Sequence, residues 1–414
     1  MQRKITRRLN AALLCGAALC AAPLQAQTVR SGVEISTSAE ATSNPYLDTN
    51  SDKFVGAGAV EVRPWVQRTT QTDQVELEAF VRLRAFTSEF DLEDSYGGNL
   101  RASSRLNART TAYGSLGVLS TTARNRLNGF DRVPGVADPI NPETPIPDFP
   151  IGDDLSLLGL PGRTTSINLL AGIDRVLDER SSAGANIAYQ KVIADNGLGA
   201  DYDNISLGAS YSHRLTDRTS VGLNANVSRA RYDGEFPDST TVSANASIDH
   251  QAGQYWFLAA SAGLATTRTD SSVFGPADAG LYAVGSASGC YRRPDQSFCL
   301  SASRAQQPSV LGGTRAQTSI GFNMNQRLSA RDRFDASANY TRSGDPQGVS
   351  LTDRSIELVS LRATLTRSFS DRLDGYIFAS GSRVYDDGAF ANRLGNGANL
   401  SFGAGVRVRL GSIR

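Results

Sequence analysis

The stretch ANLSFGAGVRVRLG, residues 398–411, alternates apolar and polar side chains with a period of two. Successive side chains of a β-strand point to opposite faces, so this period indicates a strand with one apolar and one polar face. The apolar face holds Leu400, Phe402, Ala404, Val406, Val408 and Leu410, and the polar face holds Ser401, Gly403, Gly405, Arg407 and Arg409.

The same two-faced pattern returns along the chain, for example in VELEAFVRLRA (75–85) and TSIGFNMNQ (318–326). The apolar faces carry many Ala and Gly residues, whereas the core of a soluble β-sandwich tends to carry bulky side chains. Strands of about 9–11 residues with an apolar outside and a polar inside suit a sheet that crosses a bilayer. Because no open sheet edge survives in lipid, we predict an all-β fold, a closed antiparallel transmembrane β-barrel.

Eighteen such segments can be counted, the first at 31–42 and the last at 398–411. An even number places both ends of a bacterial barrel on the periplasmic side. The connections alternate between short and long. Four of the short ones share a polar phrase: RVLDERSS (175–182), HRLTDRTS (213–220), QRLSARDR (326–333) and RSFSDRLD (367–374). We interpret them as periplasmic turns, in which Asp or Ser forms a local side-chain hydrogen bond, and the long ones as surface loops.

Residues 1–26 have the pattern of a secretory signal peptide, with a basic start, a short apolar run and a cleavage site after Ala26. The remainder, 27–414, is then the barrel. Removing the peptide takes four basic side chains and no acidic one, which leaves 38 basic against 41 acidic residues and a net charge of −3. This balance gives no attraction to nucleic acid. We expect a location in the outer membrane of a Gram-negative bacterium, with outer-membrane lipids as partners.

The longest connection, 124–162, holds seven of the fifteen prolines. Proline cannot donate to a β-ladder and favours extended geometry, so this stretch is predicted to be a long Pro-rich loop. Such long loops are usually functional or disordered. Two interpretations stay open, a loop that constricts the pore or docks a partner, and a mobile surface loop.

Only Cys290 and Cys299 remain after removal of the signal peptide, on either side of YRRPDQSF. An even pair in an oxidising compartment indicates a disulfide, here one that joins the two strands of a hairpin. A zinc site would need two further ligands nearby, and His213 and His250 lie on other hairpins. We therefore predict a disulfide and no metal site.

No nucleophile, metal-protease or nucleotide-binding motif occurs with the context that it requires. His213 and His250 both fall at strand ends predicted to be periplasmic, whereas outer-membrane hydrolases place their histidine at the outer rim or the lipid face. We predict that the protein is not an enzyme and has no cofactor.

The polar strand faces are expected to line the lumen. Arg101, Arg105 and Arg109 recur every fourth residue, which on a strand places them on one face at intervals of about 13 Å. The predicted lumen-lining residues are Glu76, Glu78, Arg82, Arg84, Arg101, Arg105, Arg109, Arg362, Arg407 and Arg409. Arginine suits carboxylates, phosphates and sugars. These residues could line a solute channel or form ion pairs that fill a wet interior.

The loop SNPYLDT after the first strand, the signal peptide, the eighteen strands and the polar turns together resemble the beta-barrel porin type 2 family over the whole mature chain. The stretch AFVRLRAFTSEFDLEDSYGG (79–98) is similar to sphingomonad members. The resemblance implies an outer-membrane barrel that accompanies surface-polysaccharide synthesis and export.

The function expected on these grounds is a passive conduit that serves surface or exopolysaccharide export, with the polysaccharide or its periplasmic export machinery as partner. A general diffusion or sugar porin is a second hypothesis. A structural or adhesin barrel that acts through its surface loops is a third. A transporter should keep a continuous polar path through the lumen, whereas a structural barrel can fill it.

Overall fold

The computed structural model describes residues 28–45, 54–87, 92–122, 163–195, 200–234, 236–270, 278–310, 313–346, 355–386 and 398–412. Over these ranges the chain forms eighteen strands. They are β1 (Thr28–Thr42), β2 (Val55–Thr69), β3 (Asp73–Phe86), β4 (Glu93–Asn107), β5 (Thr110–Thr122), β6 (Arg163–Val176), β7 (Ser181–Ala194), β8 (Tyr202–Thr216), β9 (Thr219–Tyr232), β10 (Ser239–Ala252), β11 (Trp256–Thr269), β12 (Asp278–Arg292), β13 (Gln296–Pro308), β14 (Thr314–Arg327), β15 (Asp332–Pro346), β16 (Ile356–Ser370), β17 (Leu373–Asp386) and β18 (Ala398–Gly411).

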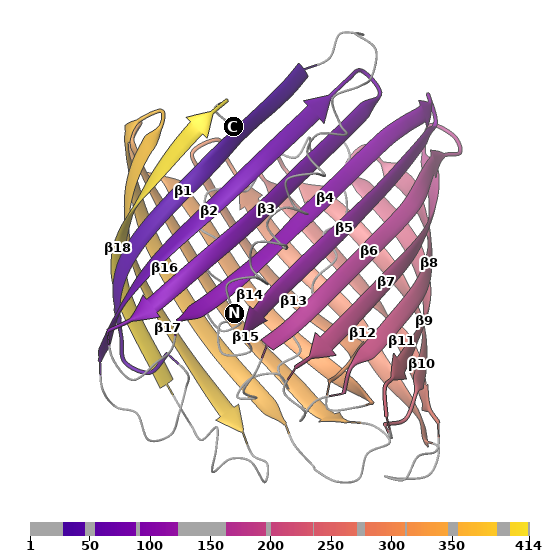
Figure 1. The fold of residues 1–414 in the computed structure, drawn as a ribbon. Helices are drawn as coiled ribbons and strands as arrows, with labels where there is room; N and C mark the ends of the chain where they lie inside the picture. Colours follow the sequence, from indigo (N-terminus) through magenta and orange to yellow (C-terminus); the bar gives the residue numbers. More distant parts are fainter. Residues whose placement is uncertain are drawn as a thin grey trace.

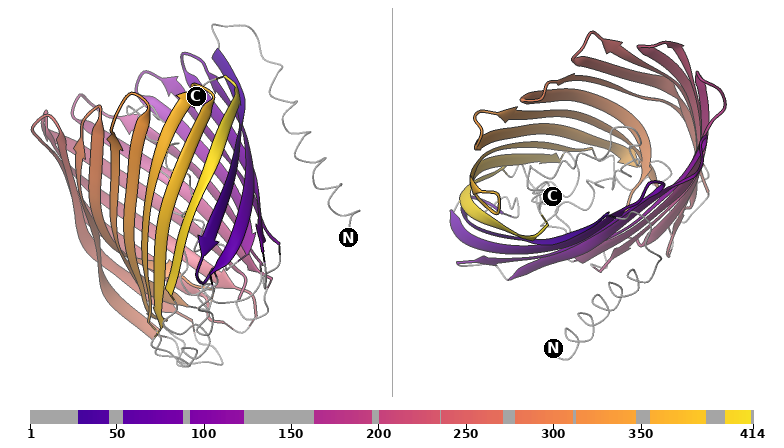
Figure 2. Two further views of the ribbon diagram at one scale, coloured as in Figure 1. Left: turned by 90° about the vertical axis from the view of Figure 1, so that its left-hand side faces the viewer. Right: turned by 90° about the horizontal axis from the view of Figure 1, so that it is seen from above.

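The strands close into a single antiparallel barrel. Each strand pairs with its neighbours in the sequence, and β1 also pairs with β18 over eleven positions, from Gly32 opposite Gly411 to Thr42 opposite Ser401. The strands tilt around the wall in Figure 1 and enclose the interior in both views of Figure 2. The prediction of a closed barrel of eighteen antiparallel strands is confirmed. No helix among the described residues is long and apolar enough to cross a membrane.

The connections divide by length between the two edges of the barrel. At one edge, which we call the short-turn edge, eight turns of two to four residues join every even-numbered strand to the next, from β2–β3 to β16–β17. The start of β1 and the end of β18 lie at this edge, the upper one in Figure 1. The other nine connections, of five residues or more, lie at the opposite, long-loop edge. The predicted signal peptide, 1–26, and the predicted Pro-rich loop, 124–162, fall outside the described residues.

A local hydrogen bond explains the repeated polar phrase of the short turns. In each of five turns an Asp, Asn, Ser or Thr side chain accepts a hydrogen bond from the backbone N–H of the arginine two positions later. The pairs are Asn107–Arg109, Asp178–Arg180, Thr216–Arg218, Ser329–Arg331 and Ser370–Arg372. The side chain thus satisfies a donor that the end of the β-ladder leaves unpaired, which is why short polar residues recur there.

The outside of the barrel is apolar and exposed. Along β10 and β11 the outward side chains Val242, Ile248 and Leu264 are 46–55% exposed, while the inward ones are more buried. Polar residues outnumber apolar ones among the buried side chains. This is the reverse of a soluble protein, and it matches a barrel whose outer surface is covered by hydrocarbon.

Aromatic side chains mark the short-turn edge of the apolar surface. Trp256, Tyr291 and Phe298 lie on neighbouring strands β11, β12 and β13, with ring centroids 5.0–5.5 Å apart. Their register places them on the outward face, where Trp256 is 42% exposed. Such rings favour the boundary between hydrocarbon and water.

The turn at Asp178 gives a pH-dependent prediction. The N–H groups of Arg180 (2.7 Å) and Ser181 (2.8 Å) donate to its carboxylate and lower the pKa of Asp178. A lowered pKa means that the stabilisation is complete above the ordinary carboxyl range and disappears as pH falls through the folded-state value. Asp178→Ala should therefore lower the urea midpoint of the micelle-bound barrel at neutral pH, and the difference from wild type should shrink on acidification.

Ser370→Ala, which removes the equivalent bond in another turn, is the control. Its effect on the urea midpoint should not vary with pH, because the hydroxyl does not titrate. A pH-independent difference between wild type and Asp178→Ala would contradict the assignment.

Candidate conduit lining

The inward faces of β17, β18 and β1 to β4 carry a network of ion pairs that we call the charged wall. Arg84 on β3 contacts Glu40 on β1 and lies 3.7 Å from Glu93 on β4. Arg63 on β2 lies 2.6 Å from Glu61 on its own strand and 3.2 Å from Glu78 on β3. Each arginine therefore joins carboxylates from more than one position of the wall.

The pairing of β1 with β18 brings a second cluster of this wall together. Arg407 lies 3.4 Å from Glu34 and 3.8 Å from Asp374, and Arg409 bonds to both of these carboxylates. The side chains of Arg407 and Asp374 are only 2% and 1% exposed. Two arginines thus share two carboxylates across β17, β18 and β1.

Glycines let aromatic rings lie against this wall. Tyr376 on β17 is opposite Gly405, and Phe378 is opposite Gly403. A Cβ atom at Gly405 would collide with the Tyr376 ring and with the backbone oxygen of Thr37. The Arg407 guanidinium then lies 5.8 Å from the Tyr376 ring centroid. On β16, the Arg362 guanidinium likewise lies 5.0 Å from the Phe378 ring centroid.

The structure places most of the predicted lining residues on the inward face. On β3 the alternation that places Arg84 in the network also directs Glu76, Glu78 and Arg82 inward. Arg101 on β4 is directly opposite Glu76, and Arg82 is opposite Glu61. Arg362, Arg407 and Arg409 are inward through the contacts given above.

The predicted row Arg101, Arg105 and Arg109 is wrong at its last member. β4 ends at Asn107, after an irregularity between Arg105 and Asn107, and Arg109 lies in the turn, where its N–H donates to Asn107 (2.9 Å). Arg105 is exposed near the short-turn edge. A spacing of four residues keeps side chains on one face only while the strand continues. LNAR at 106–109 has the same form as LTDR at 215–218, a match that could have identified the turn.

The predicted lining residues include Glu76 and Glu78 but none of the other acidic members of the network. Glu34, Glu40 and Glu61 alternate with apolar residues in VEISTSAEAT and AVEVRPW, so their strand face was readable from the sequence. Asp374 directly follows the start of β17, where the strand boundary hides the alternation. The partners of Glu34, Glu40 and Asp374 were not readable, because each of these pairs joins two strands and depends on their register.

The opposite part of the interior, the neutral wall, is built from hydroxyl, amide and small side chains on β7 to β13. Among the described inward positions of β8 to β13, charged side chains occur only toward the short-turn edge, as Arg214, Asp249 and Arg292. Hydroxyls pair along it, as in Ser261 with Ser286 (2.9 Å) and Ser303 with Ser319 on β14 (2.7 Å). Its inward polar residues include Asn186, Ser206, Ser210, Asn224, Asn226, Ser243, Asn245, Ser247, Ser288 and Ser301.

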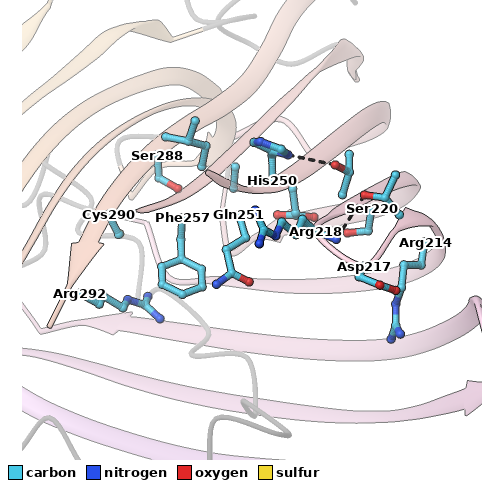
Figure 3. Close-up of a pocket in the computed structure, with 15 residues that line it drawn as sticks. Arg214, Asp217, Arg218, Ser220, His250, Gln251, Phe257, Ser288, Cys290 and Arg292 are labelled. Carbon is cyan, nitrogen blue, oxygen red and sulfur yellow. Dashed lines mark hydrogen bonds between the residues drawn. The ribbon is translucent and has the colours of Figure 1, made fainter. Parts of the chain in front are cut away.

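The two cysteines lie on the inward face at the short-turn edge. Cys290 on β12 and Cys299 on β13 are directly opposite each other and form a disulfide, with Cα atoms 4.1 Å apart. Next to it is a hollow of about 320 Å³, shown in Figure 3, that Arg214, Arg218 and Arg292 line together with Phe257. Asp217 and Asp249 line it as well, so this part of the periplasmic mouth, as we assign it, carries charges of both signs.

Each of the two histidines bonds one hydroxyl group at the short-turn edge. His213 and His250 are on the outward face at the short-turn ends of β8 and β10, bonded to Ser181 (3.0 Å) and Thr219 (2.9 Å). Among the described residues, no three His, Cys, Asp or Glu side chains gather in a way that could hold a metal ion.

No family model and no curated protein matches the chain. Solved structures of similar outline include OprD of Pseudomonas aeruginosa, with 12% identity, a TM-score of 0.42 and coverage of 93% of this chain and 96% of that one. OpdK of the same species with vanillate has 13% identity, a TM-score of 0.44 and coverage of 93% and 99%. The FrpB iron transporter of Neisseria meningitidis (F5-1 variant) has 10% identity, a TM-score of 0.45 and coverage of 92% and 82%. Likeness at this level carries no information on solute or partner.

A buried ion-pair cluster should stabilise the barrel more than an exposed ion pair does. Asp374→Asn leaves Arg407 and Arg409 with one shared carboxylate in a site excluded from solvent, so unfolding should become easier by about 3 kcal/mol. The matched control, Glu357→Gln, breaks the exposed pair with Arg342 (3.5 Å), which should cost less than about 1 kcal/mol. Urea titration in micelles measures both, and equal losses would count against a structural role for the buried cluster.

The disulfide gives a separate prediction. Thiol labelling of the denatured, unreduced protein should detect no free cysteine, and labelling of both Cys290 and Cys299 would refute the bridge. Replacing both by alanine should lower the unfolding free energy by no more than about 2–3 kcal/mol, the chain-entropy value for so short a loop, since the hairpin already holds the two strands together.

Proposed function

We propose that this protein is a passive outer-membrane conduit for hydroxyl-rich solutes, serving surface or exopolysaccharide export. The observation that carries the proposal is the uncharged hydroxyl and amide lining of β7 to β13, opposite a wall whose charges are paired among themselves. The interior thus offers hydrogen bonds along one side and ion-paired side chains along the other.

Hydroxyl and amide side chains both donate and accept hydrogen bonds, as sugar hydroxyls do. A wall of this kind can exchange water for sugar hydroxyls without a large desolvation cost at each step. Fixed charges would instead hold a charged solute and slow its release. Because Arg84 and Arg407 are buried in ion pairs, they contribute to the wall more than to the path of a solute.

The location and partners follow from the same proposal. Lipids of the outer membrane would cover the apolar outside, the short-turn edge would face the periplasm, and periplasmic export machinery would meet that edge. Membership of the beta-barrel porin type 2 family, on the resemblance given above, is part of the proposal. We expect no catalytic activity and no cofactor.

A general diffusion or sugar porin would use the same neutral wall. The two functions differ in the size of the solute and in the direction of its transport, export of polysaccharide or uptake of small sugars. Deleting the gene should reduce exported polysaccharide. Unchanged export with reduced uptake of small sugars would assign the protein to the diffusion porins. An adhesin barrel would depend on the long-loop edge and would need no open interior.

The electrical test introduces charge into the neutral wall. Asn224 and Asn245 are directly opposite each other on β9 and β10. Replacing both by lysine should leave folding intact, because both face the interior, and should shift the ion selectivity of the pore in planar bilayers toward anions. Replacing both by glutamine, the control, should leave selectivity unchanged.

If the purified protein conducts no ions, even after deletion of residues 128–160, the conduit proposal fails and the adhesin hypothesis replaces it. Conduction without any response to the lysine variant would show that the solute path does not run along the neutral wall.

A further inference from the structure

We propose that the long-loop edge carries a binding surface for the phosphate groups of outer-leaflet lipids. Outward basic side chains occur there on every second strand from β7 to β17, the strands that run toward this edge. We call the set the basic belt: Lys191, Arg229, Arg231, Arg268, Arg304, Arg342 and Arg383. The inference rests on the proposed membrane location and orientation, and it adds a ligand that the conduit itself does not need.

Strand alternation places these side chains on the lipid-facing side. On β9 the exposed positions continue from Leu223 through Val227 to Arg229 and Arg231, while Ala230 and Tyr232 between them are buried inside. On β13, Arg304 shares its face with Leu300, which is 56% exposed. The basic residues therefore continue the apolar outer face toward the rim.

The ladder register aligns the belt around the barrel. Arg229 and Arg268 are both opposite Thr240, so they lie on one rung, two strands or about 10 Å apart. Arg304 and Arg342 are likewise both opposite Thr318. Lys191 and Arg231 are both opposite Asp203. Neighbouring basic groups thus recur at a spacing set by the sheet.

Much of this charge is available to a ligand. Arg342 and Arg229 form only exposed pairs, with Glu357 (3.5 Å) and Asp238 (3.4 Å). Within the part of the chain that the structure describes, no ion pair involves Arg268, Arg304 or Arg383. Arg383 lies against the Tyr385 ring, 4.6 Å from its centroid. The guanidinium groups of Arg268, Arg304 and Arg383 are thus held at the surface with no paired carboxylate among the described residues.

The position of the belt selects lipid phosphate as the partner. A basic side chain on the lipid face costs about 2–4 kcal/mol at the bilayer midplane and almost nothing at the headgroups, so the belt must lie at headgroup level. There the planar guanidinium can bind phosphate through two hydrogen bonds. On β1 to β3 the outward positions near the same edge are apolar, Ala39, Ala41, Gly56, Gly58, Leu83 and Ala85, so the surface is an arc and not a ring.

The test compares two sets of arginines on the folded full-length barrel in detergent micelles. Arg268→Gln, Arg304→Gln and Arg383→Gln together neutralise belt members that have no ion pair among the described residues. The control is Arg68→Gln, Arg175→Gln and Arg367→Gln, three outward arginines at the short-turn edge. Binding of lipid A is titrated by native mass spectrometry, with dephosphorylated lipid A as a second probe and inorganic phosphate as competitor.

We expect the belt variant to bind lipid A about tenfold more weakly or worse, and the control variant to bind it as the wild type does. Dephosphorylated lipid A should bind the wild type no better than lipid A binds the belt variant. Equal binding of lipid A to the wild type and to the belt variant would overturn the proposal. Full competition by inorganic phosphate would also overturn it, by showing a site for free anions.

Planar-bilayer conductance separates this inference from the proposed function. The belt residues face away from the interior, so the belt variant should conduct as the wild type does. A barrel that binds lipid A through the belt without conducting would refute the conduit and leave the lipid surface standing. A barrel that conducts, and whose lipid A binding is the same in the wild type and in the belt variant, would refute the lipid surface and leave the conduit standing.

Discussion

Every backbone N–H and C=O of a membrane-spanning sheet must be paired, because the hydrocarbon supplies no partner. In this barrel the pairing of β1 with β18 meets that requirement, over eleven positions between segments more than 350 residues apart in the chain. Without it both strands would present open edges to lipid. The register of this one pair also fixes which inward side chains meet across the closure.

The closure explains where the charges gather. Glu34 on β1, Arg407 and Arg409 on β18 and Asp374 on β17 come together only when the first and last strands pair. On the neighbouring strands β1 to β3, the same alternation of inward side chains places Glu40 against Arg84 and Glu78 against Arg63. The region where the chain closes thus holds the densest ion pairing, and β8 to β13, on the far part of the circuit, form the neutral wall. An unpaired strand edge at the closure would leave backbone groups without partners in hydrocarbon, and the ion pairs of Glu34 join side chains across the same register.

The sequence predicts the repetitive features of this fold well and its long-range contacts poorly. The period of two and the alternation of short and long connections are local, so strand number and the two faces follow from the residues. Ion-pair partners such as Arg84 and Glu40 depend on register across several strands, which no local pattern encodes. Arg109 shows the limit of the local rule, because its spacing from Arg105 fits a strand while the hydrogen bond from its N–H to Asn107 makes a turn.

Three arginines show that the position of a residue on its strand determines its surroundings in this barrel. Arg407 is buried in an ion-pair cluster, Arg218 lies in a turn at the short-turn edge, and Arg304 is on the outward face near the opposite edge. The residue type is the same in all three, and composition alone cannot separate them. What separates them is parity along the strand, which chooses the inside or the outside, and distance from the strand end, which sets depth in the bilayer. In this barrel, these two properties of an arginine's position therefore decide whether it is buried in the wall, lies in a turn or is exposed on the outward face.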